Sequence, residues 1–234
     1  MPEHDSSQTL TPSEKRKLTR LRGALLSWWG EHDEAFPWRR SGASVYERVC
    51  VEVLLQRTRR ETVSAIYADF FERFPNWHAI ASCPETELGQ YLQPLGLWRR
   101  RAASLGALAR YADEHGGAFP RTGKELAKVP AVGQYVGNAI LLFQHGEPRP
   151  LVDVNMARVI ERVLRPRRLA DIRHDPWLQS AAAWLVRSSP VETNWAVLDF
   201  AAKVCRARNP RCDECQLARQ CSFAKALRRG EQAS

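Results

Sequence analysis

The chain has 234 residues, 44% of them hydrophobic, and carries 35 Lys and Arg against 26 Asp and Glu, a formal net charge of +9. This length allows one domain or two small domains with a sizeable core, and no apolar run approaches the roughly 18 residues of a membrane span. The basic balance favours a polyanionic partner, nucleic acid above all, over an acidic small molecule.

The N-terminal segment has neither the basic start nor the apolar stretch of a secretory signal, so we expect a cytoplasmic protein. Residues 1–10 are polar and are expected to be disordered. Next, Thr11-Pro12-Ser13-Glu14 combines a capping box with proline at the first helical position, which predicts a helix to about Trp29. The sequence Phe36-Pro37-Trp38-Arg39 predicts an extended turn after this helix.

A second capping box, Ser44 with Glu47, opens a predicted helix through Arg57. Residues 49–55 in its middle are apolar almost all round, so this helix should be buried. Glu52 lies within the apolar run, where a carboxylate must be paired, protonated or functional. A salt bridge from Glu52 to a nearby arginine is the plainer alternative.

Further amphipathic helices are expected along the rest of the chain, with no internal repeat and no alternating strand pattern between them. They cover residues 61–74, 84–92, 99–111, 135–143, 156–164, 175–185 and 191–204. The fold class predicted is therefore all-α. Arginines also gather at two places, where they indicate either a solvated face or a surface for a polyanion: residues 99–101, and Arg158, Arg162, Arg165, Arg167 and Arg168.

Two short helices joined by a tight turn are predicted between residues 122 and 143. Thr122 with Glu125 is a capping signal for the first helix, and Val129 to Gly133 break it before Tyr135 begins the second. The N–H groups at the start of the second helix would attract a phosphate oxygen, which positions a nucleic-acid backbone without reading its bases. A plain packing role is equally open for this pair of helices taken alone.

Four of the six cysteines lie near the C-terminus with the spacing C-x6-C-x2-C-x5-C: Cys205, Cys212, Cys215 and Cys221. In a cytoplasmic chain this density predicts one tetrathiolate metal site rather than disulfides. Zinc and iron–sulfur clusters both accept four thiolates, so the spacing alone leaves the metal open.

Taken together, these motifs resemble the DNA glycosylase superfamily that includes endonuclease III and the adenine glycosylases, over nearly the whole chain. Pro130, Val132 and Gly133 match the family's helix-hairpin-helix, although Ala131 replaces its usual first glycine. The resemblance implies two helical domains: residues 11–38 and 150–225 form an iron–sulfur cluster domain, and residues 39–149 form a six-helix barrel with the hairpin. Residues 226–234 would be a tail.

The resemblance also implies a cofactor and a partner. The cysteine spacing is that of the [4Fe–4S] loop in the endonuclease III relatives, and Arg206, Arg208 and Arg211 within the loop would face DNA phosphates. The implied partner is double-stranded DNA that contains a mispaired or damaged base, bound by a monomer without a membrane. Such a protein would associate with the nucleoid through its DNA.

The resemblance implies three catalytic residues: Tyr135 in the hairpin and two carboxylates, Asp153 and Glu52. Asp153 falls where the family keeps its catalytic aspartate, and would stay ionised to stabilise the cationic sugar or to activate water. Glu52 matches a glutamate that endonuclease III lacks, and its apolar surroundings would raise its pKa for work on the leaving base or the water. Asn155 completes the family's Asp-x-Asn pattern and would orient the site. Helix capping before Met156 is the plainer role open to Asp153.

Tyr135 predicts the reaction type, because this hairpin position differs between relatives. Bifunctional endonuclease III relatives carry a lysine that forms a Schiff base with the sugar, the adenine glycosylases carry serine, and thymine–guanine mismatch glycosylases carry tyrosine. We therefore expect a monofunctional glycosylase that flips thymine or uracil opposite guanine out of the duplex and hydrolyses its N-glycosidic bond. Lys124 and Lys128 could add weak strand cleavage.

Residues expected to contact DNA lie at three places. Gln56 and Arg57 follow the catalytic helix, where they would fill the gap left by the flipped base or pair with the estranged guanine. Val132, Gly133 and Gln134 belong to the hairpin, and Asn155 lies two residues after Asp153. Simple surface exposure is the alternative for Gln56 and Arg57.

Three other functions stay open at this stage. One is an adenine glycosylase acting on adenine opposite 8-oxoguanine or guanine, which Tyr135 and the short segment after Cys221 disfavour. Another is an oxidised-pyrimidine glycosylase. The third is a DNA lesion-binding module without catalysis, which the presence of both carboxylates disfavours because a pure binder needs no buried acid.

Overall fold

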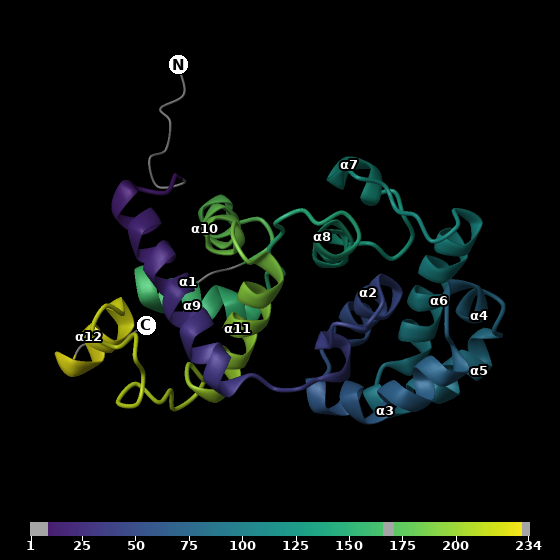
Figure 1. The fold of residues 1–234 in the computed structure, drawn as a ribbon, viewed down its shortest axis with the longest axis horizontal. Helices are drawn as coiled ribbons and strands as arrows, with labels where there is room; N and C mark the ends of the chain where they lie inside the picture. Colours follow the sequence, from purple (N-terminus) through teal and green to yellow (C-terminus); the bar gives the residue numbers. More distant parts are fainter. Residues whose placement is uncertain (1–8, 166–170, 231–234) are drawn as a thin grey trace, which may run out of the picture. The chain divides into compact units, whose positions relative to one another are not determined.

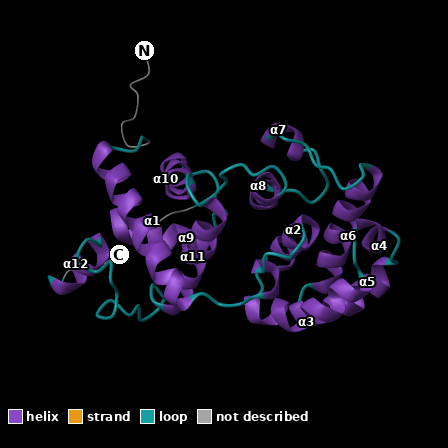
Figure 2. Cartoon of the chain, viewed as in Figure 1, coloured by secondary structure: helices purple, strands orange, loops and turns teal. Residues whose placement is uncertain are grey.

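The computed structural model describes residues 9–165 and 171–230, and every regular element within them is helical (Figure 2). The predicted all-α class is therefore confirmed. In these ranges no helix combines the length and the apolar character needed to cross a membrane. Most of the expected disordered N-terminus, together with Arg167 and Arg168, lies outside the described residues.

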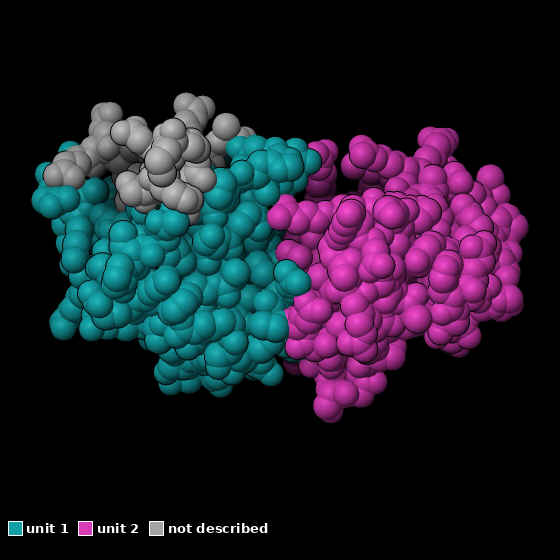
Figure 3. All heavy atoms as spheres, turned by 90° about the horizontal axis from the view of Figure 1, so that it is seen from above, with its two compact units in different colours: residues 1–34, 148–234 teal, residues 35–147 magenta. Residues whose placement is uncertain are grey.

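The chain divides into two compact units, coloured separately in Figure 3. Unit 1 contains residues 1–34 and 148–234, and unit 2 contains residues 35–147. Each unit buries a hydrophobic core of its own. The predicted boundaries after residues 38 and 149 lie a few residues beyond those of the structure.

Unit 1 packs its longest helix across the helices of its C-terminal part. Its helices are α1 (Pro12–His32), α9 (Val154–Leu164), α10 (Pro176–Val186), α11 (Pro190–Lys203) and α12 (Ser222–Arg228). Helix α1 lies against α10 and α11, and α9 contacts α10, α11 and α12 (Figure 1). The predicted capping box is present at Thr11 and Glu14. The expected tail from residue 226 is wrong at its start, because α12 continues to Arg228.

Unit 2 contains seven α-helices and two short 3-10 helices. They are η1 (Pro37–Arg39), α2 (Val45–Leu54), α3 (Arg60–Arg73), α4 (Trp77–Ala81), α5 (Glu85–Leu92), η2 (Gln93–Leu95), α6 (Trp98–Glu114), α7 (Gly123–Leu126) and α8 (Gln134–Phe143). Helix α6 packs against α4 and α5, while α2 packs against α8 (Figure 1).

The end of α2 differs from the prediction. The helix stops at Leu54 rather than Arg57, and a turn follows in which Arg57 takes a left-handed φ of 57°. A non-glycine residue with positive φ cannot continue a right-handed helix. Gln56 and Arg57 therefore lie in a turn and not on the helix.

Candidate functional site

The buried glutamate of α2 meets the first turn of α8. Glu52 is only 2% exposed, as expected for a residue within an apolar helix. The Tyr135 hydroxyl donates a hydrogen bond of 2.7 Å to Glu52 Oε2. The structure thus brings together two of the three predicted catalytic residues within unit 2.

The helix-hairpin-helix is formed by α7, the turn after it and α8. Thr122 caps α7 by accepting a hydrogen bond from the Glu125 amide, while no side chain caps the start of α8 at Gly133. Ala131 has a left-handed φ of 62°, at the position where the resemblance expects glycine. This conformation is costly for a residue with a Cβ, by about 1 kcal/mol.

A groove of about 570 Å³ lies beside this hairpin, entirely within unit 2. Gln56 and Arg57 line it, together with Val132 and Gly133. Four of the residues expected to contact DNA therefore share one groove, while Gln134 is exposed at the start of α8 but is not among its lining residues. Gln56 and Arg57 are both exposed, so surface exposure and a place in the groove hold together.

Leu97 is a residue of this groove that the sequence reasoning missed. Its side chain is 60% exposed, and it has a left-handed φ of 49° directly after Gly96, whose φ is 69°. The sequence indicates a tight turn at Leu95-Gly96-Leu97, but nothing in that pattern marks which leucine faces outward. An exposed leucine in the same groove as Gln56 and Arg57 is a suitable side chain to insert between stacked bases.

Asp153, the third predicted catalytic residue, lies in unit 1 at the start of α9. Its carboxylate accepts hydrogen bonds from the backbone amides of Asn155 and Met156 at 2.9 and 2.8 Å. Helix capping, the plainer role considered for Asp153, is therefore present. The Asn155 side chain also donates to Asp153 Oδ2 at 2.6 Å, and Arg158 donates to Asn155 Oδ1 at 3.0 Å.

Opposing influences set the pKa of Asp153. Burial is the largest and raises the pKa, while the hydrogen bonds from Met156 and Asn155 and the charge of Arg158 lower it. The net direction is upward from 3.8, so Asp153 takes up a proton at a higher pH than a solvated aspartate does.

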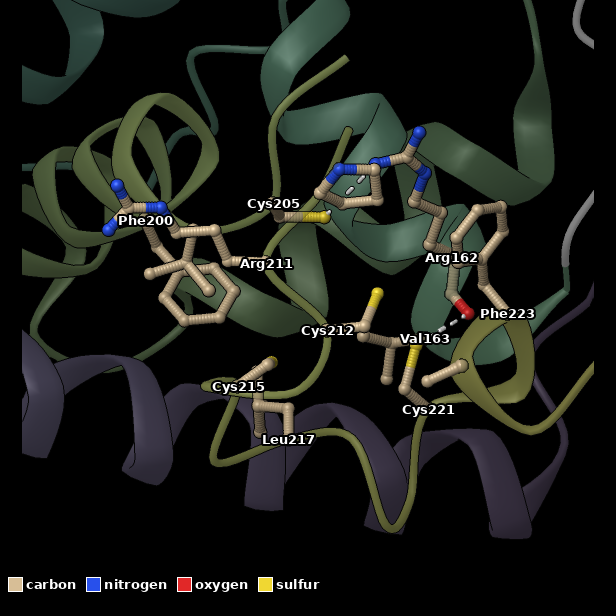
Figure 4. Close-up of a pocket in the computed structure, with 13 residues that line it drawn as sticks. Arg162, Val163, Phe200, Cys205, Arg211, Cys212, Cys215, Leu217, Cys221 and Phe223 are labelled. Atoms are coloured by element: carbon tan, nitrogen blue, oxygen red, sulfur yellow. Dashed lines mark hydrogen bonds between the residues drawn. The ribbon is translucent and has the colours of Figure 1, made fainter. Parts of the chain in front are cut away.

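The four C-terminal cysteines line one cavity of unit 1 (Figure 4). Phe200, Leu217 and Phe223 add an apolar wall. Burial raises the pKa of the Cys215 thiol to about 11. Within residues 9–165 and 171–230, no group of three or more His, Cys, Asp or Glu side chains is arranged to hold a single metal ion.

Several arginines that the sequence analysis places in charged clusters instead hold the protein's own backbone. Arg158 Nε donates to Cys205 O at 2.9 Å, and Arg162 donates to the carbonyls of Arg206 and Ala207 at 2.7 and 3.0 Å. Arg165 pairs with Glu14. These three side chains fix the cysteine loop and α1 on α9, so their clustering in sequence reflects packing more than a surface for a polyanion.

Comparisons with known proteins agree with this geometry. The family model for "HhH-GPD superfamily base excision DNA repair protein" matches residues 50–172. A thymine-DNA glycosylase of Aeropyrum pernix is 35% identical over 216 residues, which cover 90% of this chain and 96% of that protein. The adenine DNA glycosylase of Homo sapiens is 30% identical over 230 residues, which cover 92% of this chain and 41% of that protein. The solved structure of a thermostable thymine-DNA glycosylase has a TM-score of 0.80 and 28% identity, and the match covers 90% of this chain and 97% of that one.

Proposed function

This chain belongs to the HhH-GPD superfamily of base excision DNA repair proteins, and from that premise we propose that it is a monofunctional DNA N-glycosylase for thymine or uracil mispaired with guanine. The observation that carries the proposal is the hydrogen bond from Tyr135 to Glu52. A phenol cannot form the Schiff base through which a lysine at this position would cleave the strand. Because Tyr135 stands where a strand-cleaving relative has lysine, we expect base release without strand cleavage.

The proposed reaction begins with extrusion of the target base, because the glycosidic bond is inaccessible inside a stacked duplex. Gln56, Arg57 and Leu97 line one groove and are exposed, which supports a role in filling the gap that the base leaves. Arg57 would pair with the estranged guanine, since a guanidinium can donate to guanine O6 and N7 together.

Two carboxyl groups would then serve bond cleavage. The sugar becomes oxocarbenium-like as the bond breaks, and Asp153 in its ionised form would stabilise that charge or activate the water. Asn155 donates to Asp153 Oδ2 and so holds the carboxylate in one orientation. Tyr135 does the same for Glu52, which would interact with the departing base or the water.

The hairpin would bind the DNA backbone. A Cβ atom added at Gly133 would meet nothing within 4 Å, so the protein leaves open space at the start of α8. Backbone amides at a helix N-terminus favour a phosphate oxygen there. Val132 and Gln134 flank this position and would contact the same strand.

We also propose a [4Fe–4S] cluster at Cys205, Cys212, Cys215 and Cys221. The residues fit this group because four thiols, the ligand set of such clusters, line one cavity with an apolar wall. When bound, the cluster would fix the loop between α11 and α12 without taking part in bond cleavage. Iron and sulfide content of the purified protein, compared with that of Cys215→Ser, tests the assignment.

We further propose a monomer that acts on DNA in the cytoplasm.

The test of the proposed function uses duplexes that carry T·G, U·G, A·8-oxoguanine or an oxidised pyrimidine. Each reaction is split, and one half receives alkali before the strands are resolved. We expect cleavage of the T·G and U·G strands only after alkali. Release from the adenine or oxidised-pyrimidine duplex would assign another substrate, and cleavage without alkali would contradict the monofunctional reaction.

Variants of the two carboxyl groups separate catalysis from binding. Asp153→Asn and Glu52→Gln should each lower the single-turnover rate of base release by about 10²- to 10⁴-fold, the range for positioned acid–base groups. Binding of the T·G duplex should persist in both variants. Tight binding by the wild type without any base release would instead establish a DNA lesion-binding module.

A further inference from the structure

Arg101 is a buried arginine on α6, only 8% exposed. Its place beside Arg99 and Arg100 in the sequence predicts surface charge, and the structure shows that this prediction is wrong for Arg101. Both neighbours are exposed, whereas the Arg101 side chain points into unit 2. Buried arginines are rare because desolvation of the guanidinium is costly.

Among the described residues, the Arg101 guanidinium donates to neutral oxygen atoms at the end of α2, in the turn after it and in the turn before α6. Nε bonds to Gly96 O at 2.9 Å, and Nη1 bonds to Leu54 O at 3.2 Å. Nη2 bonds to Gln56 O at 2.7 Å and to Thr58 Oγ1 at 2.5 Å. One side chain therefore links the turn after α2 with the turn before α6.

Both of these turns contain a residue in a sparsely populated conformation. Arg57 lies between two of the Arg101 acceptors, Gln56 and Thr58, and has a φ of 57°. Leu97 follows a third acceptor, Gly96, and has a φ of 49°. Left-handed backbone at a residue with a Cβ persists only where its surroundings enforce it. The four hydrogen bonds of Arg101 supply such enforcement on each side.

The planar guanidinium suits this task better than another cation would. It presents five N–H donors in a fixed fork, so one group can satisfy several carbonyls that lie in different directions. A lysine ammonium is a compact charge on a flexible stem and holds no such fixed arrangement. One acceptor, Leu54 O, is also among the last carbonyls of α2, which lack acceptor partners within the helix.

We propose that Arg101 is a positioning residue for base extrusion, which holds the Gln56–Arg57 turn and Leu97 in a single preformed arrangement at the groove. This inference rests on the proposed glycosylase function. A turn whose backbone is already fixed in its bound geometry loses little conformational entropy when its side chains enter the duplex, so extrusion becomes more favourable. The loss of Arg101 should therefore weaken base extrusion while the catalytic groups remain in place.

The test compares Arg101→Met, which removes the donors, with Arg101→Lys, which keeps the charge. Arg110→Met is the matched control, because Arg110 is an exposed arginine on the same helix. The probe is a G·T duplex with a non-cleavable 2′-fluoro thymidine and an adjacent 2-aminopurine, whose fluorescence rises when its neighbour leaves the stack. We expect the fluorescence rise to fall several-fold in both Arg101 variants and to match the wild type in Arg110→Met. Circular dichroism at the assay temperature verifies that each variant is folded, and Arg101→Lys carries the test if Arg101→Met does not fold.

A second measurement separates positioning from general support of the fold. On a cleavable duplex, Arg101→Met should lower kcat/KM by about ten- to a hundredfold, as expected for displaced reacting partners. In a Gln56→Ala/Arg57→Ala/Leu97→Ala background the same change should alter kcat/KM by less than about twofold, because none of the three side chains remains to be positioned. An equal loss in both backgrounds, or an unchanged fluorescence rise, would overturn the proposal. A wild type that extrudes the base but releases none would contradict the glycosylase function alone.

Discussion

Asp153 combines two roles that the sequence presents as alternatives. A carboxylate offers about four acceptor positions, and the two amides and the Asn155 side chain occupy three of them. Capping of α9 therefore fixes the orientation of the group and leaves it able to accept one more partner. The same contacts oppose the effect of burial on its pKa.

The Asn155 side chain should control the acid limb of the pH profile. Asn155→Ala removes a donor that lowers the pKa of Asp153, so this pKa should rise further. The ionised fraction at a given acidic pH then falls, and the acid limb of the single-turnover rate moves to higher pH. Val154→Ala is the control, because Val154 is 66% exposed. An acid limb that stays in place in Asn155→Ala would show that Asp153 does not titrate in it.

Gly133 should be required for DNA binding but not for stability. Its φ is −86°, which any residue adopts, and an added Cβ would meet no atom of the protein within 4 Å. Gly133→Ala should thus leave the melting temperature unchanged, yet lower affinity for the T·G duplex roughly tenfold by crowding the phosphate. Gly123→Ala, which also adds a methyl in open space, should bind as the wild type does. Equal affinities in the two variants would exclude close backbone approach at Gly133.

The burial of Glu52 and the place of Asp153 at the start of a helix were predictable from the sequence, and the groove residues only partly. Glu52 is visible as an acid within an apolar run, and Asp153 as part of a motif. Leu97 and Arg101 gave no such signal. Their roles depend on positive φ angles at Leu97 and Arg57. Such turns are usually marked by glycine, asparagine or aspartate, and neither position carries one of these residues.

Among the elements of unit 1, three helices meet at one carboxylate. Glu14 forms the capping box of α1, pairs with Arg165 after α9 at 2.5 Å and accepts a hydrogen bond of 3.2 Å from the Trp177 indole of α10. Burial alone would raise the pKa of Glu14, but the hydrogen bonds from Arg165 and Thr11 lower it from 4.5 to about 2. The ionised carboxylate therefore stabilises the packing of α1.

Glu14→Gln should lower the free energy of unfolding at pH 7 by about 2 kcal/mol, the cost of losing hydrogen bonds to a charged group. The folded-state pKa lies below the unfolded value, so the wild-type advantage is present above pH 4.5 and disappears as the pH falls toward 2. Urea unfolding of both proteins at pH 7, 4 and 2.5 measures it. Glu72→Gln, at an exposed position of α3, is the control and should change the free energy of unfolding by less than about 0.5 kcal/mol. A difference between wild type and Glu14→Gln that does not shrink with pH would contradict the ionic account.

Element prediction succeeded where periodicity extends over several turns. The capping boxes at Thr11 and Ser44 gave the starts of α1 and α2. Short helices such as α4 and α12 were missed, because five or seven residues carry too little of a 3.6-residue period. The end of α2 was missed for another reason. Arg101, which holds the end of α2 and the turn after it, lies 43 to 47 positions away in the sequence, so no local pattern indicates where the helix stops.

For the whole molecule, the net charge of +9 includes arginines that are not available to DNA, because they bind groups of the protein itself. Arg101, Arg158 and Arg162 donate to backbone carbonyls, and Arg165 pairs with a carboxylate. Exposed arginines remain in the groove at Arg57 and Arg100, and in the cysteine loop at Arg206 and Arg208. Composition predicts the kind of partner, but only the packing distinguishes arginines that bind DNA from arginines that hold the fold.

The difference between arginines that bind DNA and arginines that hold the fold should be measurable in the salt dependence of DNA binding. Each phosphate neutralised by a cation releases counterions, so log Kd against log salt concentration changes in slope by about 0.9 per contact. Arg208→Met should reduce the slope by about one such step, because Arg208 is exposed in the cysteine loop. Arg165→Met removes the same charge but leaves the slope as in wild type, since its guanidinium pairs with Glu14. Titrations between 50 and 300 mM salt, roughly the range in which the slope is linear, measure both variants on one T·G duplex. Equal slopes in all three proteins would mean that the charge of the cysteine loop does not meet phosphate.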